Sequence, residues 1–278
     1  MNRCILNNYP CVLLFCVLLL TSSGLNAGTQ VFSEPNRARD SLKDLLHQAK
    51  DNCRRSELNY LLGKEASDNE NNEAALNYGK KALAIAKDAN CKELLLKCYN
   101  LVGTAFDDLA NYSEAEKYYT VGLETAKKEN NFKYASVFYT NIGECFRNQD
   151  NFSKALDSYM HALKIDGEQK DSVRIVSDYF TLTLLYSNIE EPHSFKKYLL
   201  KTIDLAAKLN NEKVMAKCYN MYGIYQGNQE HYDSAQYFYY KGLELAKKNG
   251  ILHLEAKIYS NLSDIFMNKK DMAKTIEY

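Results

Sequence analysis

The chain has 278 residues, with 35 Lys and Arg against 35 Asp and Glu, so its formal net charge is zero. This balance argues against a nucleic-acid-binding protein, which needs a basic face, and 46% apolar residues exclude wholesale disorder. Twelve Gly and three Pro are too few for the turns of a β-sandwich or an α/β enzyme, so the composition indicates an all-helical chain. The 22 Tyr in a chain without Trp suggest that one structural position is filled repeatedly.

Residues 1–27 differ from the rest of the chain and predict a secretory signal peptide. Arg3 supplies a positive start, residues 11–20 form an apolar run, and small and polar residues follow up to Ala27, where cleavage is expected. The apolar run is roughly half of what a membrane-spanning helix needs, and a short uncleaved anchor is the alternative. We therefore expect export to the periplasm or to the extracytoplasmic face of the membrane.

The loss of residues 1–27 would leave five of the eight Cys, and an odd number at irregular spacing does not indicate a disulfide framework. Buried single thiols are the expectation. Cys91 and Cys98 would lie about 10 Å apart along one helix, too far to bridge. Cys53 with Cys91 is the one pair to consider, because both would start neighbouring helices.

Residues 28–55 are expected to form an N-terminal linker and a capping helix. Within them, residues 37–50 fall in register with a second helix of the repeat that follows, so they look like a half-repeat. Stacked repeats need such a cap because a terminal unit otherwise leaves an apolar face uncovered.

A repeat of forty residues organises the chain from about residue 56 to its end. One column is mostly Gly: Gly63, Gly103, Gly143, Thr183, Gly223 and Ser263. Tyr stands four residues before this column, and a mostly aromatic column stands three residues after it. Further along each unit come a column of mostly Ala, a column that carries Tyr119, Tyr159 and Tyr239, and another column of mostly small residues. The Tyr excess is therefore largely a property of the repeat.

Each unit is predicted to contain two helices, because its apolar residues recur at spacings of three and four. Small columns would let these helices approach closely, and the aromatic columns would fill the gaps between them. The second helix is expected to start at Ser113, Ser153 or Asp233, and Ser113 would form a capping box with Glu116. Helices are expected to end near residues that tolerate a left-handed turn: Asn90, Asn130, Asn210 and Gly250.

These columns resemble the tetratricopeptide repeat, with Tyr standing where that family often has Trp. The usual unit has about 34 residues, so the longer unit here suggests longer helices. The resemblance covers residues 56–278 and implies an all-α fold, a right-handed superhelical solenoid of antiparallel helix pairs with five repeats plus a truncated sixth. The fourth unit departs from the pattern at Thr183, Pro192 and Phe195, and we expect the stack to bend or to pack differently there.

Arrangements typical of catalysis, cofactor binding or metal binding are missing from the sequence. The five His are scattered, and none lies in an H-E-x-x-H or C-x-x-C motif, so no metal is expected. Neither a G-x-G-x-x-G nor a P-loop motif occurs, so no cofactor is expected. Asp and Glu fall on the polar faces of the expected helices, where charges are ordinarily solvated. The chain is therefore predicted not to be an enzyme.

The resemblance implies a concave groove, lined by the first helices, in which Asn, Lys or Arg side chains hold a peptide or a segment of a partner protein. Polar residues of the expected first helices are the candidates for groove contacts: Lys97, Asn100, Thr104, Asn141, Glu144, Arg147, Lys217, Asn220 and Asn261. Asn141 and Asn261 stand where the family more often carries its peptide-binding Asn. Asn100 and Asn220 lie one column earlier, which would turn them about 100° away. The alternative is that these side chains belong to a solvated helix face.

Asp or Asn also fills one column in every unit: Asp68, Asp108, Asn148, Asn188, Asn228 and Asn268. A ladder of ligand contacts is one interpretation of this column. Asn and Asp favour helix ends and turns, however, so we expect the column to mark the ends of the first helices.

The repeats, the signal peptide and the missing catalytic motifs together predict an exported, non-enzymatic scaffold that captures a protein or peptide, without nucleic acid or metal. The sixth unit stops at Tyr278, inside its second helix, so the chain is expected to be truncated or to continue into another domain. The alternative function is therefore the sensor portion of a membrane signal-transduction protein, linked to the membrane by a missing C-terminal segment that precedes a histidine kinase or DNA-binding domain.

Overall fold

The computed structural model describes residues 34–269, which form twelve α-helices and no strand. The predicted signal peptide and residues 270–278 lie outside the described residues. No helix between residues 34 and 269 has both the length and the apolar character needed to cross a membrane. The helices are α1 (Glu34–Gln48), α2 (Asn52–Asp68), α3 (Asn72–Asp88), α4 (Lys92–Asp108), α5 (Tyr112–Lys128), α6 (Phe132–Asn148), α7 (Phe152–Glu168), α8 (Ser172–Asn188), α9 (Pro192–Lys208), α10 (Glu212–Asn228), α11 (Tyr232–Lys248) and α12 (Leu252–Asn268).

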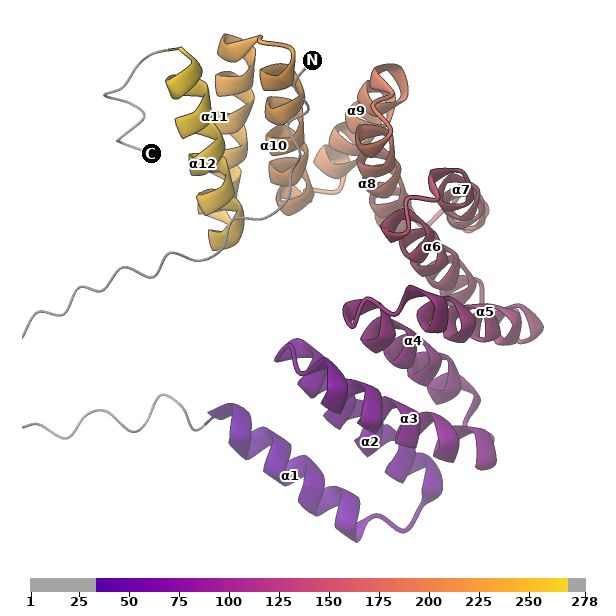
Figure 1. Ribbon diagram of the computed structural model, residues 1–278. Helices are drawn as coiled ribbons and strands as arrows, with labels where there is room; N and C mark the ends of the chain where they lie inside the picture. The colour runs from indigo at the N-terminus through magenta and orange to yellow at the C-terminus, as the bar shows by residue number, and fades with distance from the viewer. Residues whose placement is uncertain (1–33, 270–278) are drawn as a thin grey trace, which may run out of the picture.

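Consecutive helices pack against each other and follow an open arc (Figure 1). Each unit pairs an even-numbered first helix with the odd-numbered second helix that follows it, as α4 pairs with α5. In Figure 1, α4 and α6 lie on the inner side of the arc, and α5 and α7 lie on its outer side. At the N-terminal end, α1 packs against α2. The all-α solenoid of helix pairs predicted from the forty-residue columns is confirmed.

The turns are uniform along the solenoid. Helices α2 to α12 each contain 17 residues, and three residues separate each helix from the next. From the α2–α3 turn onward, the middle residue of each turn has a positive φ. This holds at Asn90, Asn130, Asn210 and Gly250, as predicted, but also at Ala110, where φ is 56°.

One residue in each of these turns ends one helix and begins the next. The backbone amide of Asn111 donates to the carbonyl of Phe106 at 2.8 Å, which closes the C-terminal end of α4. Its side chain accepts the backbone amide of Glu114 and so caps the start of α5. The predicted capping box at Ser113 is therefore wrong, because α5 begins at Tyr112, one residue earlier, with Asn111 as the cap. The Asp and Asn column occupies the last residue of each first helix, as expected.

The Gly and Tyr columns form the contacts that join the two helices of a unit. A β-carbon at Gly103 would collide with the buried ring of Tyr119. The same relationship joins Gly143 with Tyr159 and Gly223 with Tyr239. In the fourth unit Thr183 stands in place of the Gly and Leu199 stands in place of the Tyr, and both side chains are fully buried. Each buried Tyr therefore depends on a Gly in the neighbouring helix, which explains why the two columns occur together.

The expectation of buried single thiols holds for Cys98, Cys145 and Cys218. It is wrong for Cys53 and Cys91, which form a disulfide with their Cα atoms 5.9 Å apart. Cys53 lies in the first turn of α2, and Cys91 is the cap residue of α4. The disulfide therefore ties the first helices of two adjacent units together at their N-terminal ends.

Candidate functional site

Four of the predicted groove residues form two equivalent amide pairs between neighbouring first helices. Asn141 Nδ2 on α6 donates to Asn100 Oδ1 on α4 at 2.7 Å. Three units further along, Asn261 Nδ2 on α12 donates to Asn220 Oδ1 on α10 at 2.9 Å. Asn100 and Asn220 stand one repeat column earlier than Asn141 and Asn261. On a single helix this offset would make the side chains point in different directions, but between two neighbouring helices it brings them into contact.

These amide pairs keep hydrogen-bonding capacity after they bond to each other. A side-chain amide offers two N–H donors and an oxygen with two lone pairs, and one bond uses only part of this set. Asn100, Asn141 and Asn261 are half-buried, so they remain accessible from one side, whereas Asn220 is 4% exposed. A half-buried amide pair can donate to a carbonyl and accept from an N–H, which are the two groups of a peptide backbone.

Glu144 and Arg147 are also brought together, and a residue outside the predicted set joins them. Arg147 Nη2 lies 2.5 Å from Glu144 Oε2, and the Tyr159 hydroxyl donates to Glu144 Oε1 at 2.7 Å. Burial raises the pKa of Tyr159, and the nearby charge of Glu144 raises it further, so the hydroxyl remains a donor. Glu144 is thus held by two partners and positions the ring that packs on Gly143.

The remaining candidates do not join these groups. The Thr104 hydroxyl lies 3.2 Å from the Tyr119 hydroxyl, which again links a first helix to the second helix of its unit. Lys97 pairs with Glu93 at 3.3 Å, whereas Lys217 is exposed and its Nζ lies 6.0 Å from the centre of the Phe180 ring. The two lysines of the repeated Lys-Cys-Tyr-Asn segment therefore have different surroundings.

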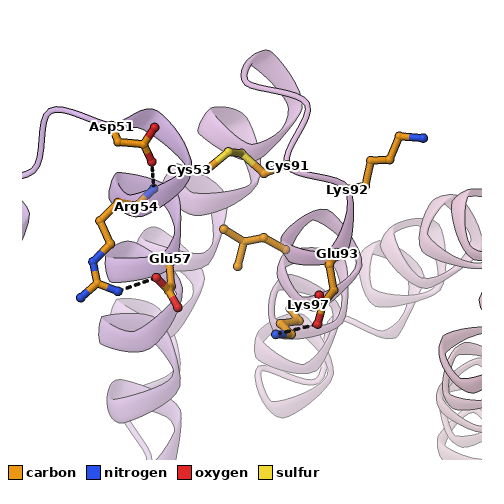
Figure 2. Close-up of a pocket in the computed structure, with 9 residues that line it drawn as sticks. Asp51, Cys53, Arg54, Glu57, Cys91, Lys92, Glu93 and Lys97 are labelled. Atoms are coloured by element: carbon orange, nitrogen blue, oxygen red, sulfur yellow. Dashed lines mark hydrogen bonds and ion pairs between the residues drawn. A yellow bond between two sulfur atoms is a disulfide. The ribbon is translucent and has the colours of Figure 1, made fainter.

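Lys97 also lines an open cavity of about 540 Å³ between the N-terminal ends of α2 and α4 (Figure 2). The Cys53–Cys91 disulfide lies at one end of this cavity, and Figure 2 shows ion pairs on both helices below it. On α2, Arg54 lies 2.5 Å from Glu57, and on α4 Lys97 pairs with Glu93. The cavity wall consequently carries both signs of charge. These two pairs lie within single helices, whereas Lys92 in the same wall pairs with Glu129, outside α4, at 3.0 Å.

A buried acidic cluster lies between α6, α7 and α8, and sequence reasoning missed it. Asp166 and Asp178 are 2% and 5% exposed. Ser136 Oγ donates to Asp166 Oδ2 at 2.5 Å, and Arg174 Nε donates to Asp166 Oδ1 at 2.8 Å. Burial raises the pKa of Asp178, the charge of Asp166 raises it further, and Arg174 opposes the change. A buried Asp cannot be distinguished from a solvated one by helical spacing alone, so the sequence held no signal for this cluster.

The described residues contain no group of three or more His, Cys, Asp or Glu side chains that could hold a metal ion. Asp166 and Asp178 form a pair that Arg174 partly neutralises, and this pair lies inside a helix joint. Its surroundings indicate a structural role in joining two units.

Comparison with known proteins confirms the resemblance seen in the repeat columns. Residues 137–169 match the family model described as Tetratricopeptide repeat, a segment that begins within α6 and ends just after α7. No curated protein matches the sequence.

Several solved structures share the fold. A signal transduction ATPase with numerous domains from Pyrococcus horikoshii, which carries a tetratricopeptide repeat sensor, has a TM-score of 0.70 at 18% identity, covering 87% of this chain and 37% of that chain. Aspartyl phosphate phosphatase F from Bacillus subtilis has a TM-score of 0.67 at 17% identity, covering 88% and 62%. The Rap conjugation gene regulator of the plasmid pLS20, in complex with the Phr* peptide, has a TM-score of 0.62 at 18% identity, covering 87% and 64%. At these identities the likeness shows the fold, which is that of a tetratricopeptide-repeat solenoid.

Proposed function

We propose that this tetratricopeptide-repeat solenoid is a non-enzymatic scaffold that binds an extended peptide or protein segment along its first helices. The observation that carries this proposal is the repeated amide pair, Asn100 with Asn141 and Asn220 with Asn261. Two equivalent anchors three units apart can each bind one backbone amide group of the same extended ligand. The Rap regulator of similar fold, which was solved with a peptide, supports a peptide as the class of ligand.

A peptide-display selection on the immobilised full chain, followed by titration of an enriched peptide, tests this proposal. Asn141→Ala and Asn261→Ala should each weaken binding about three- to tenfold, because each removes one or two hydrogen bonds to the ligand. Asn188→Ala is the matched control, since this exposed Asn lies at the end of α8 away from both pairs. The proposal fails if no peptide is enriched, or if all three variants bind the enriched peptide as tightly as the unaltered chain.

Export from the cytoplasm is part of the proposal. It is supported by the pattern of residues 1–27 and by the Cys53–Cys91 disulfide, because disulfides persist mainly in oxidising compartments. Alkylation of the denatured, unreduced protein from its native host tests both points. Three alkylated residues, Cys98, Cys145 and Cys218, are expected once the leader is removed. Alkylation of Cys53 and Cys91 as well, or recovery of residues 1–27 in a soluble cytoplasmic fraction, would contradict export.

A second candidate function is the sensor portion of a larger signalling protein. The observation in its favour is the similarity to the tetratricopeptide repeat sensor of the Pyrococcus ATPase, of which this chain spans 37%. A membrane helix followed by a histidine kinase or a DNA-binding domain is expected in the reading frame beyond Tyr278. A stop codon directly after Tyr278 would exclude this candidate and leave the peptide-binding proposal untouched.

A further inference from the structure

The joint between the fourth and fifth units differs from the others because two aromatic rings occupy columns of smaller residues. Phe195 stands in the column that is Ala in four other units: Ala75, Ala115, Ala155 and Ala235. Tyr225 stands in the column that holds Ala105, Cys145, Leu185 and Ile265. The two rings meet with centroids 4.9 Å apart. Contact between α9 and α10 is the least extensive of the joints between successive units from α3 to α12, and the α7–α8 and α11–α12 joints are only slightly more extensive.

A cavity of about 340 Å³ opens at this joint, between the C-terminal halves of α8 and α10 and the start of α9. Its volume falls within the range of small-ligand pockets. Six apolar or aromatic side chains form most of the lining: Tyr186, Pro192, Phe195, Met221, Ile224 and Tyr225. Tyr186 and Tyr225 are half-buried, and each already packs on another ring, Tyr186 on Tyr198 and Tyr225 on Phe195, so only part of each ring remains for a ligand.

The polar part of the lining is acidic. Glu190 and Glu191 both contribute to it, and none of the described residues that line this cavity is a Lys or an Arg. The Glu191 carboxylate caps α9 by accepting the Ser194 amide at 2.7 Å. Hydrogen bonds from the Ser194 side chain and then from its amide lower the pKa of Glu191, so the group is ionised at neutral pH. Both α8 and α10 also end at the cavity, and the C-terminal end of a helix carries a partial negative charge. The N-terminal end of α9, which carries a partial positive charge, lies there too, and Glu191 caps it.

We propose that this cavity, between Tyr186, Tyr225 and Glu190, binds an organic cation such as a guanidinium or alkylammonium group. Ring faces attract cations, and a nearby carboxylate adds to that attraction without opposition from a basic residue. An anion would meet the Glu190 carboxylate and two negative helix ends, with Glu191 already engaged in capping α9, and a neutral apolar ligand would gain nothing from these charges. The cation comes either from a free small molecule or from a Lys or Arg side chain of a bound peptide, and the site itself is independent of the amide pairs.

Calorimetric titration of the full chain with Nα-acetylarginine amide and with Nα-acetylcitrulline amide tests this proposal, because the two compounds have nearly the same shape and only the arginine derivative is charged. The arginine derivative should bind at least about tenfold more tightly. A peptide with one internal Arg, compared with the same peptide carrying citrulline, distinguishes the sources: charge-dependent binding of the peptide alone assigns the cation to a peptide side chain. Equal binding of the charged and neutral forms in both comparisons would overturn the proposal.

Two variants connect the binding to this cavity. Glu190→Gln should weaken binding of the charged ligand about fivefold, since it removes one partly solvated charge. Glu230→Gln is the matched control, because Glu230 occupies the same turn position one unit later, with φ of 60° against 54°, and does not line the cavity. Tyr225→Leu, which restores a residue type found in that column, should abolish charge-dependent binding while thermal unfolding shows that the solenoid remains folded. An equal effect of the two Gln variants would overturn the assignment.

Discussion

The ring of Tyr119 occupies the space that a β-carbon of residue 103 would need, so Gly103 is a packing requirement of the second unit. Gly103→Ala should lower the free energy of unfolding by about 1–3 kcal/mol, the usual cost of overpacking a core. Gly167→Ala is the control, because a β-carbon there meets nothing within 4 Å and replaces a helical Gly in α7. This control should raise stability by up to about 1 kcal/mol. Urea unfolding of both variants measures the difference, and equal effects would show that the ring can move away.

The left-handed turns predict a second matched pair of variants. Ala110 has φ of 56°, a conformation in which a β-carbon is strained, whereas Gly250 has φ of 63° and no β-carbon. Ala110→Gly should raise the free energy of unfolding by about 0.5 kcal/mol, because relief of strain exceeds the added flexibility of the unfolded chain. Gly250→Ala should lower it by about 1 kcal/mol. Thermal unfolding of both proteins checks the signs, and a destabilised Ala110→Gly variant would contradict the strain.

The buried carboxyl group of Asp178 predicts a dependence of stability on pH. Burial and the charge of Asp166 raise its pKa to about 8, against about 3.9 in an unfolded chain, so the folded state holds a proton that the unfolded state releases. The stabilisation is complete below pH 4 and is lost as pH rises towards 8, by at most about 1.4 kcal/mol per pH unit.

Asp178→Asn should flatten this part of the pH profile, because the amide cannot ionise. Urea unfolding at pH 5, 6.5 and 8 measures the slope for both proteins. Asp204→Asn is the control, since the Asp204 side chain is 66% exposed, and its slope should match that of the unaltered chain. Parallel profiles for Asp178→Asn and the unaltered chain would contradict a retained proton.

The Cys53–Cys91 disulfide spans 38 residues, and its loss should lower the stability of the first units by about 3 kcal/mol. Repeats are stabilised mainly by their neighbours, so the loss should remain near α2 and α4. Hydrogen exchange should show faster exchange in α2 after reduction and no change in α12. A Cys53→Ala/Cys91→Ala variant should exchange like the reduced protein and be insensitive to reductant; uniform acceleration along the chain would contradict a local effect.

Periodic columns allowed much of the fold to be predicted, because each column reports one recurring contact. Gly143 and Tyr159 show this well: the spacing implied a small and a large residue packed together, and the structure places the ring on the Gly. Helix starts were harder to predict, since Asn111 and Ser113 are both good cap residues two positions apart. The closing hydrogen bond from Asn111 to Phe106, which depends on the preceding helix, selects Asn111.

The sites were less predictable because they depend on contacts between units. The hydrogen bond between Asn100 and Asn141 depends on the angle at which α4 and α6 pack. The spacing of residues along a single helix gives no information about this angle. Asp178 carries no sign of burial in its local sequence, since its neighbours Asp166 and Arg174 come from α7 and from another turn of α8. The sequence shows Phe195 as an exception in the Ala column. The cavity that Phe195 lines with Tyr225, however, depends on the distance between α9 and α10, which the sequence does not give.

The uniform three-residue turns make the units interchangeable in length. Each turn from residue 69 onward closes a helix with the same pair of backbone hydrogen bonds, so a cut in one turn can be joined to the equivalent turn forty residues away without disturbing either helix end. Removal or duplication of such a block would alter the reach of the arc while keeping every local cap. The distance between the two amide pairs can therefore be changed in steps of whole units.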